Sequence, residues 1–297
     1  MMKKINIPAV ALAATFAFAG RVLSVGKGSL PEFGVAALIA LLIIPLAEIS
    51  ARGIFCSKKP SVLGVIFALA VIIAALYTAV TTASEFSSFA AHTMLSGVSE
   101  LLIKAVFRLL CAHIASFGEG AVRKLSVITF TVAATVSVVL FAFSARSFDL
   151  SETKDLIGGI SASGVIRELG NIFAPAVLAL IYLSGDAEKT RLGSRGAVLS
   201  VIFASLLLLV CRLNVSLLFG DSFAAALDYP YSEAVSTVTV GRLFARMEGW
   251  AYLMYYAASV LRATVCLSLC TRFLCYLPCL AKKKRAAAFA LALICLV

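Results

Sequence analysis

Charged side chains are scarce in this sequence. Asp, Glu, Lys and Arg together make up 14% of the 297 residues, whereas a soluble domain has about 25%. Apolar residues make up 62%, and the mean hydropathy is +1.03. This composition excludes an ordinary soluble domain and predicts a polytopic membrane protein, with about 20 residues per span. The net charge of +11 collects at the ends of apolar runs, so the positive-inside rule explains it and we expect no nucleic-acid partner.

Catalytic and metal-binding motifs are also missing. The sequence has no HExxH, Walker A or GxSxG motif and no paired-carboxylate motif. It has two histidines, and its eight cysteines include no CxxC pair, so we expect no metal site and no cofactor. The cysteines near the C-terminal end, Cys266, Cys270, Cys275 and Cys279, are better explained as small apolar residues of helices. We therefore expect neither an enzyme nor an ATP-driven pump.

Apolar runs bounded by cations predict eight spans and the start of a ninth. They cover residues 7–25, 33–50, 60–82, 101–117, 125–144, 156–183, 197–219, 248–270 and 286–297. The first run resembles a signal peptide up to residue 19, but its apolar character continues beyond that point. The last run is too short to span alone, so we expect a single transmembrane domain, residues 1–297, with about eight to nine spans and a missing C-terminal helix. Cations gather at alternate ends, which predicts a cytoplasmic N-terminus.

Two of these runs are interrupted by residues that disfavour a continuous helix. The first contains Gly20 and Arg21, where we expect an unwound turn, and the sixth contains several glycines, the pair Arg167–Glu168 and Pro175. Such breaks are typical of discontinuous transmembrane helices, whose half-helix ends bind substrate near the bilayer midplane. The predicted substrate-binding residues are Ala19, Gly20, Arg21, Gly158, Gly159, Ser161 and Gly164. Close helix packing by small residues would explain the glycines equally well.

Ionisable side chains within or near the spans are few. They are Glu85, Lys104, Arg108, His113, Arg212 and Arg262. Because a charge at the bilayer centre costs about 2.5–3.5 kcal/mol on insertion scales, each is expected to face the bundle interior or a partner. Lys104 and Arg108 share a helical face, and snorkelling to the interface would also explain them. For Arg262, the hypothesis is that its guanidinium takes the place of a coupling cation.

The stretch from residue 229 to residue 274 combines an amphipathic segment with a long apolar one. The amphipathic part, Tyr231–Met247, meets the apolar run at the charged sequence Arg246-Met247-Glu248. An amphipathic segment that leads into a span containing a buried cation is typical of a protein with a gated interior. The predicted gating or coupling residues are Glu85, Arg246, Glu248 and Arg262.

One run in this stretch carries a family resemblance. Residues 238–248, VTVGRLFARME, together with Arg262 in the next span, resemble the spore germination permeases, the B subunits of germinant receptors. Residues 81–95 and 115–126 are also similar to segments of that family. The family looks like a branch of the amino acid–polyamine–organocation superfamily. This resemblance implies a leucine-transporter-like inverted-repeat helix bundle, with repeats at about residues 5–145 and 156–297 and unwound first and sixth helices at the substrate site.

The resemblance also implies a function. It predicts a permease-like subunit that binds a small germinant, an amino acid, and signals to other germinant receptor subunits within the lipid bilayer of the spore inner membrane. Three alternatives stay open at this point. They are a secondary amino-acid transporter of the same superfamily, an integral membrane enzyme acting on lipid or cell-wall precursors, and a degenerate, truncated gene product.

Overall fold

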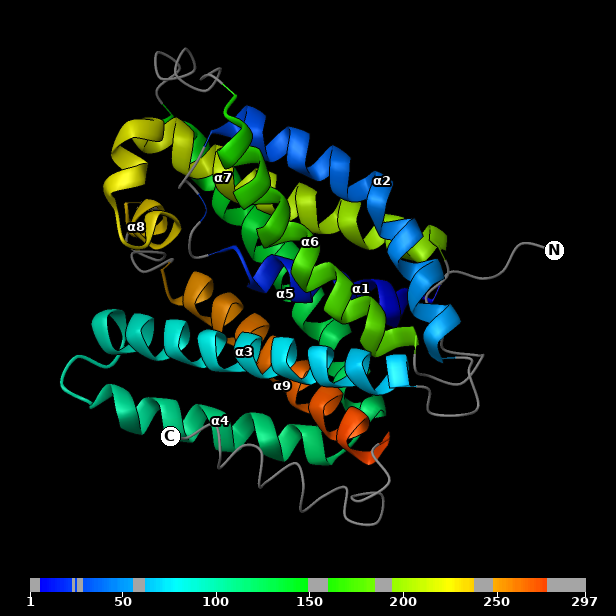
Figure 1. The fold of residues 1–297 in the computed structure, drawn as a ribbon. Helices are drawn as coiled ribbons and strands as arrows, with labels where there is room; N and C mark the ends of the chain where they lie inside the picture. The colour runs from blue at the N-terminus through cyan, green and yellow to red at the C-terminus, as the bar shows by residue number, and fades with distance from the viewer. Residues whose placement is uncertain are drawn as a thin grey trace.

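The computed structural model describes residues 6–22, 25, 29–55, 62–148, 160–184, 194–237 and 248–276, and this part of the chain is helical without strands (Figure 1). The helices are α1 (Ile7–Ala19), α2 (Leu30–Phe55), α3 (Val62–Thr93), α4 (Glu100–Ser116), α5 (Glu119–Ser144), α6 (Ala162–Ser184), α7 (Ser194–Ala226), α8 (Pro230–Ser236) and α9 (Glu248–Tyr276), with a 3₁₀ turn, η2, at Ala145–Ser147. Five of them, α3, α5, α6, α7 and α9, are long and apolar enough to cross a membrane, and α1 and the first part of α2 are shorter apolar helices.

Helix α1 lies at the centre of the bundle, in contact with α5, α6, α7 and α9. Every residue from Ala9 to Ala19 is buried, as expected for a helix that is apolar all round. The helix begins after Asn6, whose side-chain oxygen accepts a hydrogen bond from the N–H of Ala9 at 3.4 Å. It ends at Ala19, and Gly20 follows in a turn. The predicted end of regular helix at Gly20 and Arg21 is therefore confirmed.

Helices α3 and α4 lie side by side, and both contact α9 (Figure 1). Their outer faces expose large apolar side chains, including Ile73, Leu101 and Val106. Exposed apolar surface of this kind is unfavourable in water and favourable in contact with lipid tails. The chain is thus an integral, multi-pass membrane protein built as an all-helical bundle.

Helix α6 corrects one expectation from the sequence. It runs without interruption from Ala162 to Ser184, with Pro175 inside it, so the predicted break at Arg167–Glu168 is wrong. The helix accommodates this charged pair because Arg167 is exposed, while Glu168 is buried and forms an ion pair with Arg21, which follows α1. The carboxylate of Glu168 is neutralised by Arg21, so the helix continues through this position. The predicted site residues Gly158 and Gly159 lie outside the described residues.

Helices α7 and α9 carry Arg212, Glu248 and Arg262, three of the ionisable residues that the sequence singles out. Helix α7 bends at Gly220, whose backbone φ of 72° and ψ of 154° are non-helical and whose positive φ favours glycine. Helix α8 covers the start of the predicted amphipathic segment, and Arg246 lies outside the described residues. Glu248 is the first residue of α9. The division of the chain into two repeats stays a prediction.

Candidate functional site

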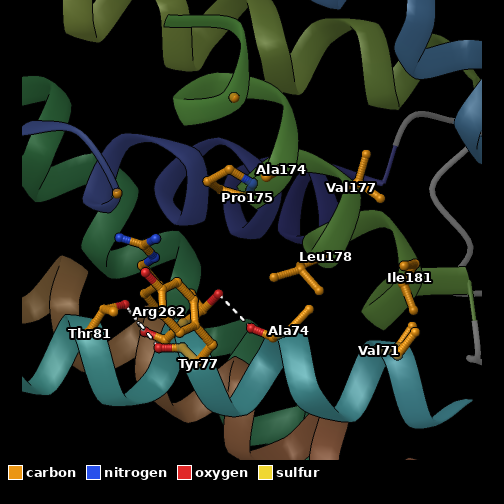
Figure 2. A pocket seen from close by; sticks show the side chains of 14 residues that line it. Val71, Ala74, Tyr77, Thr81, Ala174, Pro175, Val177, Leu178, Ile181 and Arg262 are labelled. Carbon is orange, nitrogen blue, oxygen red and sulfur yellow. Dashed lines mark hydrogen bonds between the residues drawn. The ribbon is translucent and has the colours of Figure 1, made fainter. Parts of the chain in front are cut away.

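A cavity of about 520 Å³ lies between α3 and α6 (Figure 2). Gly20, just beyond the end of α1, and Arg262, on α9, complete its lining. In Figure 2, Val71 and Ala74 of α3 face Leu178 and Ile181 of α6 across it. Ligand pockets in proteins have volumes of about 300–1,000 Å³ and largely apolar walls. The cavity therefore has the size and lining of a site for a small molecule.

The two threonine hydroxyl groups that line the cavity already have partners in their own helix. Thr78 donates to the carbonyl of Ala74 at 2.8 Å, and Thr81 donates to the carbonyl of Tyr77 at 3.0 Å (Figure 2). Among the described residues of the lining, Arg262 is the one charged side chain. Arg262 is thus the strongest polar group that the cavity offers to a ligand.

The guanidinium group of Arg262 lies directly against Gly20. A Cβ atom built on Gly20 would be 3.0 Å from both Cζ and one terminal nitrogen of Arg262. The Cζ atom also lies 5.9 Å from the ring centre of Phe16, one turn earlier in α1. The last carbonyl groups of a helix give its C-terminus a partial negative charge. Arg262 therefore places its positive charge at the negative end of α1, and the absence of a side chain at Gly20 permits this approach.

Glu85 lies on α3, four residues after the cavity-lining Thr81 and hence on the same helical face. Its side chain is exposed. Within the described residues, Glu85 and Arg262 do not form an ion pair, which would require a nitrogen–oxygen distance of 4.0 Å or less. The structure thus brings together Gly20 and Arg262, which the sequence predicted as separate site and coupling residues, whereas Glu85 does not line the cavity.

A buried ionic cluster joins the end of α1 to α6 and α7. Arg21 forms an ion pair with Glu168, whose side chain is fully buried. On α7, Arg212 lies 3.8 Å from Asp221 across the bend at Gly220, and it also interacts electrostatically with Glu168. Arg21 is thus committed to a carboxylate of the protein. Glu168 and Asp221 were not predicted from the sequence as partners of these arginines. An acidic residue beside an apolar run that contains an arginine could have indicated such a pair.

Ser161 and Gly164, predicted to bind substrate, lie at the start of α6 against a side chain of α2. The carboxylate of Glu32 accepts hydrogen bonds from the backbone N–H of Ser161 at 3.1 Å and from its hydroxyl at 2.5 Å. A Cβ atom on Gly164 would overlap the same carboxylate. The positive end of α6 thus holds an anionic group of the protein itself. The substrate role of Ser161, Gly164 and Ala19 stays a prediction.

Arg272 forms a further ion pair between helices. Arg272, near the end of α9, bonds with Glu119 at the start of α5 and donates to the backbone carbonyl of Tyr182 on α6 at 2.5 Å. Its Cζ atom lies 5.0 Å from the centre of the Tyr182 ring. One arginine therefore connects three helices, α5, α6 and α9.

Comparison with known proteins shows the fold. No family model matches the sequence, and no curated protein matches it. Among solved structures, the chain is similar to a Na⁺-coupled sialic acid symporter in a substrate-bound, outward-open state. The TM-score is 0.65 at 12% identity, over 97% of this chain and 71% of that one. The predicted leucine-transporter-like helix bundle is confirmed by this likeness, whereas membership of the spore germination family is not shown.

Proposed function

We propose that this chain binds an amino acid in the cavity between α3 and α6 and acts as the permease-like subunit of a spore germinant receptor. One observation carries the binding step: a cavity of about 520 Å³ lies where the end of α1 meets α3, α6 and α9. An interrupted helix beside a central cavity is where permeases of related architecture place their substrates. The resemblance of residues 238–248 and Arg262 to spore germination permeases supports the receptor role.

Arg262 acts in this proposal as a built-in cation. Its guanidinium lies against Gly20 at the negative end of α1. A metal ion bound at the same place would be repelled by that charge. We therefore expect ligand binding to be independent of Na⁺.

A second candidate function is secondary transport of an amino acid. The likeness of the fold to a Na⁺-coupled symporter supports it. Both functions use the same cavity, so they differ only in the step after binding. A receptor subunit passes a conformational change to partner subunits, whereas a transporter releases the solute on the other side of the membrane.

Two measurements on the purified protein test the proposal. The first is ligand-dependent thermal stabilisation in detergent over the common amino acids, because a ligand that binds the native state raises the melting temperature by mass action. The second is uptake of the same labelled amino acid into proteoliposomes, with and without Na⁺.

Binding without uptake supports the receptor subunit, and accumulation in the vesicles supports the transporter. A folded protein that no solute stabilises contradicts both functions. Arg195→Gln is a suitable control, since Arg195 is exposed at the start of α7 and does not line the cavity.

A further inference from the structure

We propose that residues 286–297, an apolar segment that follows α9, pack as a helix over the open side of the cavity between α3 and α6. The segment covers the exposed rim of the cavity and separates it from the lipid. This proposal concerns the rim and does not depend on which solute the cavity binds. It is carried by the gap between the two helices, the residues along the rim, the place where α9 ends, and the length and pattern of the segment.

The gap arises because α3 and α6 do not pack closely against each other in the described part of the chain. Helix α6 packs against α1 and α2, and α3 packs against α4 and α9. Between α3 and α6 lies the cavity of about 520 Å³. A Cβ atom built on Gly170, in its lining, would meet nothing within 4 Å. An apolar gap between two spans is filled either by lipid tails or by another helix.

The rim of the cavity carries small, exposed residues on both helices. Ala70 and Ala74 of α3 are exposed, as are Gly170 and Ala174 of α6, and all four line the cavity (Figure 2). The two residues of each pair are one helical turn apart and share a face. Small residues at this spacing let the backbone of another helix approach closely within a membrane. The rim therefore favours a helix as its cover.

Helix α9 ends beside one end of this rim. Near that end of α9, the thiol of Cys270 donates to the carbonyl of Ile72 at 3.8 Å, and Arg272 donates to the carbonyl of Tyr182 at 2.5 Å. Each of these carbonyls belongs to a residue next to one that lines the cavity. The nine residues 277–285 then reach up to about 30 Å. The chain can therefore bring residue 286 to this end of the rim.

Residues 286–297 match the rim in length and in pattern. Twelve residues form a helix about 18 Å long, and the lining of α3 from Ala70 to Thr81 extends over about 16 Å. In a helix, the small residues fall on one face and large apolar residues on a neighbouring face. The small residues are Ala288, Ala292 and Cys295, and the large ones are Phe289, Leu293 and Leu296. The first face suits the rim, and the second suits lipid tails.

The experiment is disulfide cross-linking of the full chain in proteoliposomes, read by mass spectrometry of the linked peptides. A disulfide requires Cα atoms about 4.4–6.8 Å apart. If the segment enters beside Val71, the helical rise places residue 288 near Ala74 and Cys295 near Thr81. The test proteins are therefore Ala74→Cys with Ala288→Cys, and Thr81→Cys with the native Cys295.

Two sets of controls accompany these proteins. Leu101→Cys and Val106→Cys, each with Cys295, lie on the exposed outer face of α4 and do not line the cavity. Ala174→Leu fills the rim, and its matched control Ala142→Leu places the same side chain on the exposed surface of α5. The melting temperature of each variant shows whether it folds.

We expect both pairs at the rim to cross-link within one chain in most molecules, several-fold more than either α4 control. Ala174→Leu should lower the yield between Thr81→Cys and Cys295 several-fold, because the new side chain takes the place of the segment. Ala142→Leu should leave that yield unchanged.

Four results would overturn the proposal. They are equal yields at the rim and on α4, a preference of Cys295 for the α4 sites, disulfides between two chains, and no cross-link in folded protein. The third result would show that a second copy covers the rim, and the fourth would leave lipid as its cover. None of them bears on solute binding, which thermal stabilisation measures separately.

Discussion

Gly20 and Arg262 are in direct contact, although 242 positions separate their numbers in the sequence: a Cβ atom on Gly20 would lie 3.0 Å from Cζ of Arg262. We expect Gly20→Ala to push the guanidinium away from the end of α1. Because a guanidinium is the far end of a flexible side chain, the free energy of unfolding should change by less than about 1 kcal/mol. Amino-acid affinity should fall several-fold, as measured by titration calorimetry.

A matched control for this change is Gly34→Ala on α2, where a Cβ atom would meet nothing within 4 Å. It should stabilise the helix by about 0.5–1 kcal/mol and leave the affinity unchanged. Equal affinities in the two variants would show that contact between Gly20 and Arg262 has no part in binding.

The buried ion pair of Arg21 and Glu168 predicts a large loss of stability when one partner is removed. Glu168 is fully buried, and Glu168→Gln removes the carboxylate that pairs with the buried charge of Arg21. The expected cost is about 3 kcal/mol, read from thermal or denaturant unfolding in detergent. The double variant Arg21→Met with Glu168→Gln should cost less than the sum of the single changes. Additive costs would mean that the pair contributes no coupling energy.

The contact between Glu32 and the start of α6 predicts a dependence of one substitution on another. Gly164→Ala alone should destabilise the protein by about 1–2 kcal/mol, because the new methyl group overlaps the carboxylate and displaces its hydrogen bonds to Ser161. In a Glu32→Ala background the same change meets no carboxylate, and alanine favours the helix by up to about 1 kcal/mol. Thermal unfolding of the four proteins tests this. A constant cost of Gly164→Ala in both backgrounds would contradict it.

Arg272 predicts the largest effect among the partly exposed ion pairs. Arg272→Gln removes contacts with both α5 and α6 and should cost about 1 kcal/mol, since its partner Glu119 is partly exposed. Arg123 lies 3.5 Å from the same carboxylate within α5. Arg123→Gln should therefore cost less, about 0.5 kcal/mol or below. Equal losses in thermal unfolding would show that the link between helices adds nothing.

Several elements could be predicted from residue patterns because apolar runs of span length mark them. Residues 62–93 and 100–116 form the helices expected near residues 60–82 and 101–117, and Glu248 begins α9 as expected. The end of α1 at Gly20 was likewise expected from a glycine and an arginine in an apolar run. Helix α6 was not predicted correctly: its charged pair and Pro175 indicated a break, whereas burial of Glu168 beside Arg21 lets the helix continue.

The sequence by itself determined the membrane setting and the helical class, and it placed Arg262 in an apolar span, since these follow from composition and from the pattern of apolar runs. Only the tertiary structure decided which charges meet. Arg21 pairs with Glu168, 147 residues away, whereas Arg262 lines a cavity and its buried Nε has no hydrogen-bond partner among the described residues. Spacing along a chain fixes neighbours within one helix, but contacts between helices depend on how the helices pack.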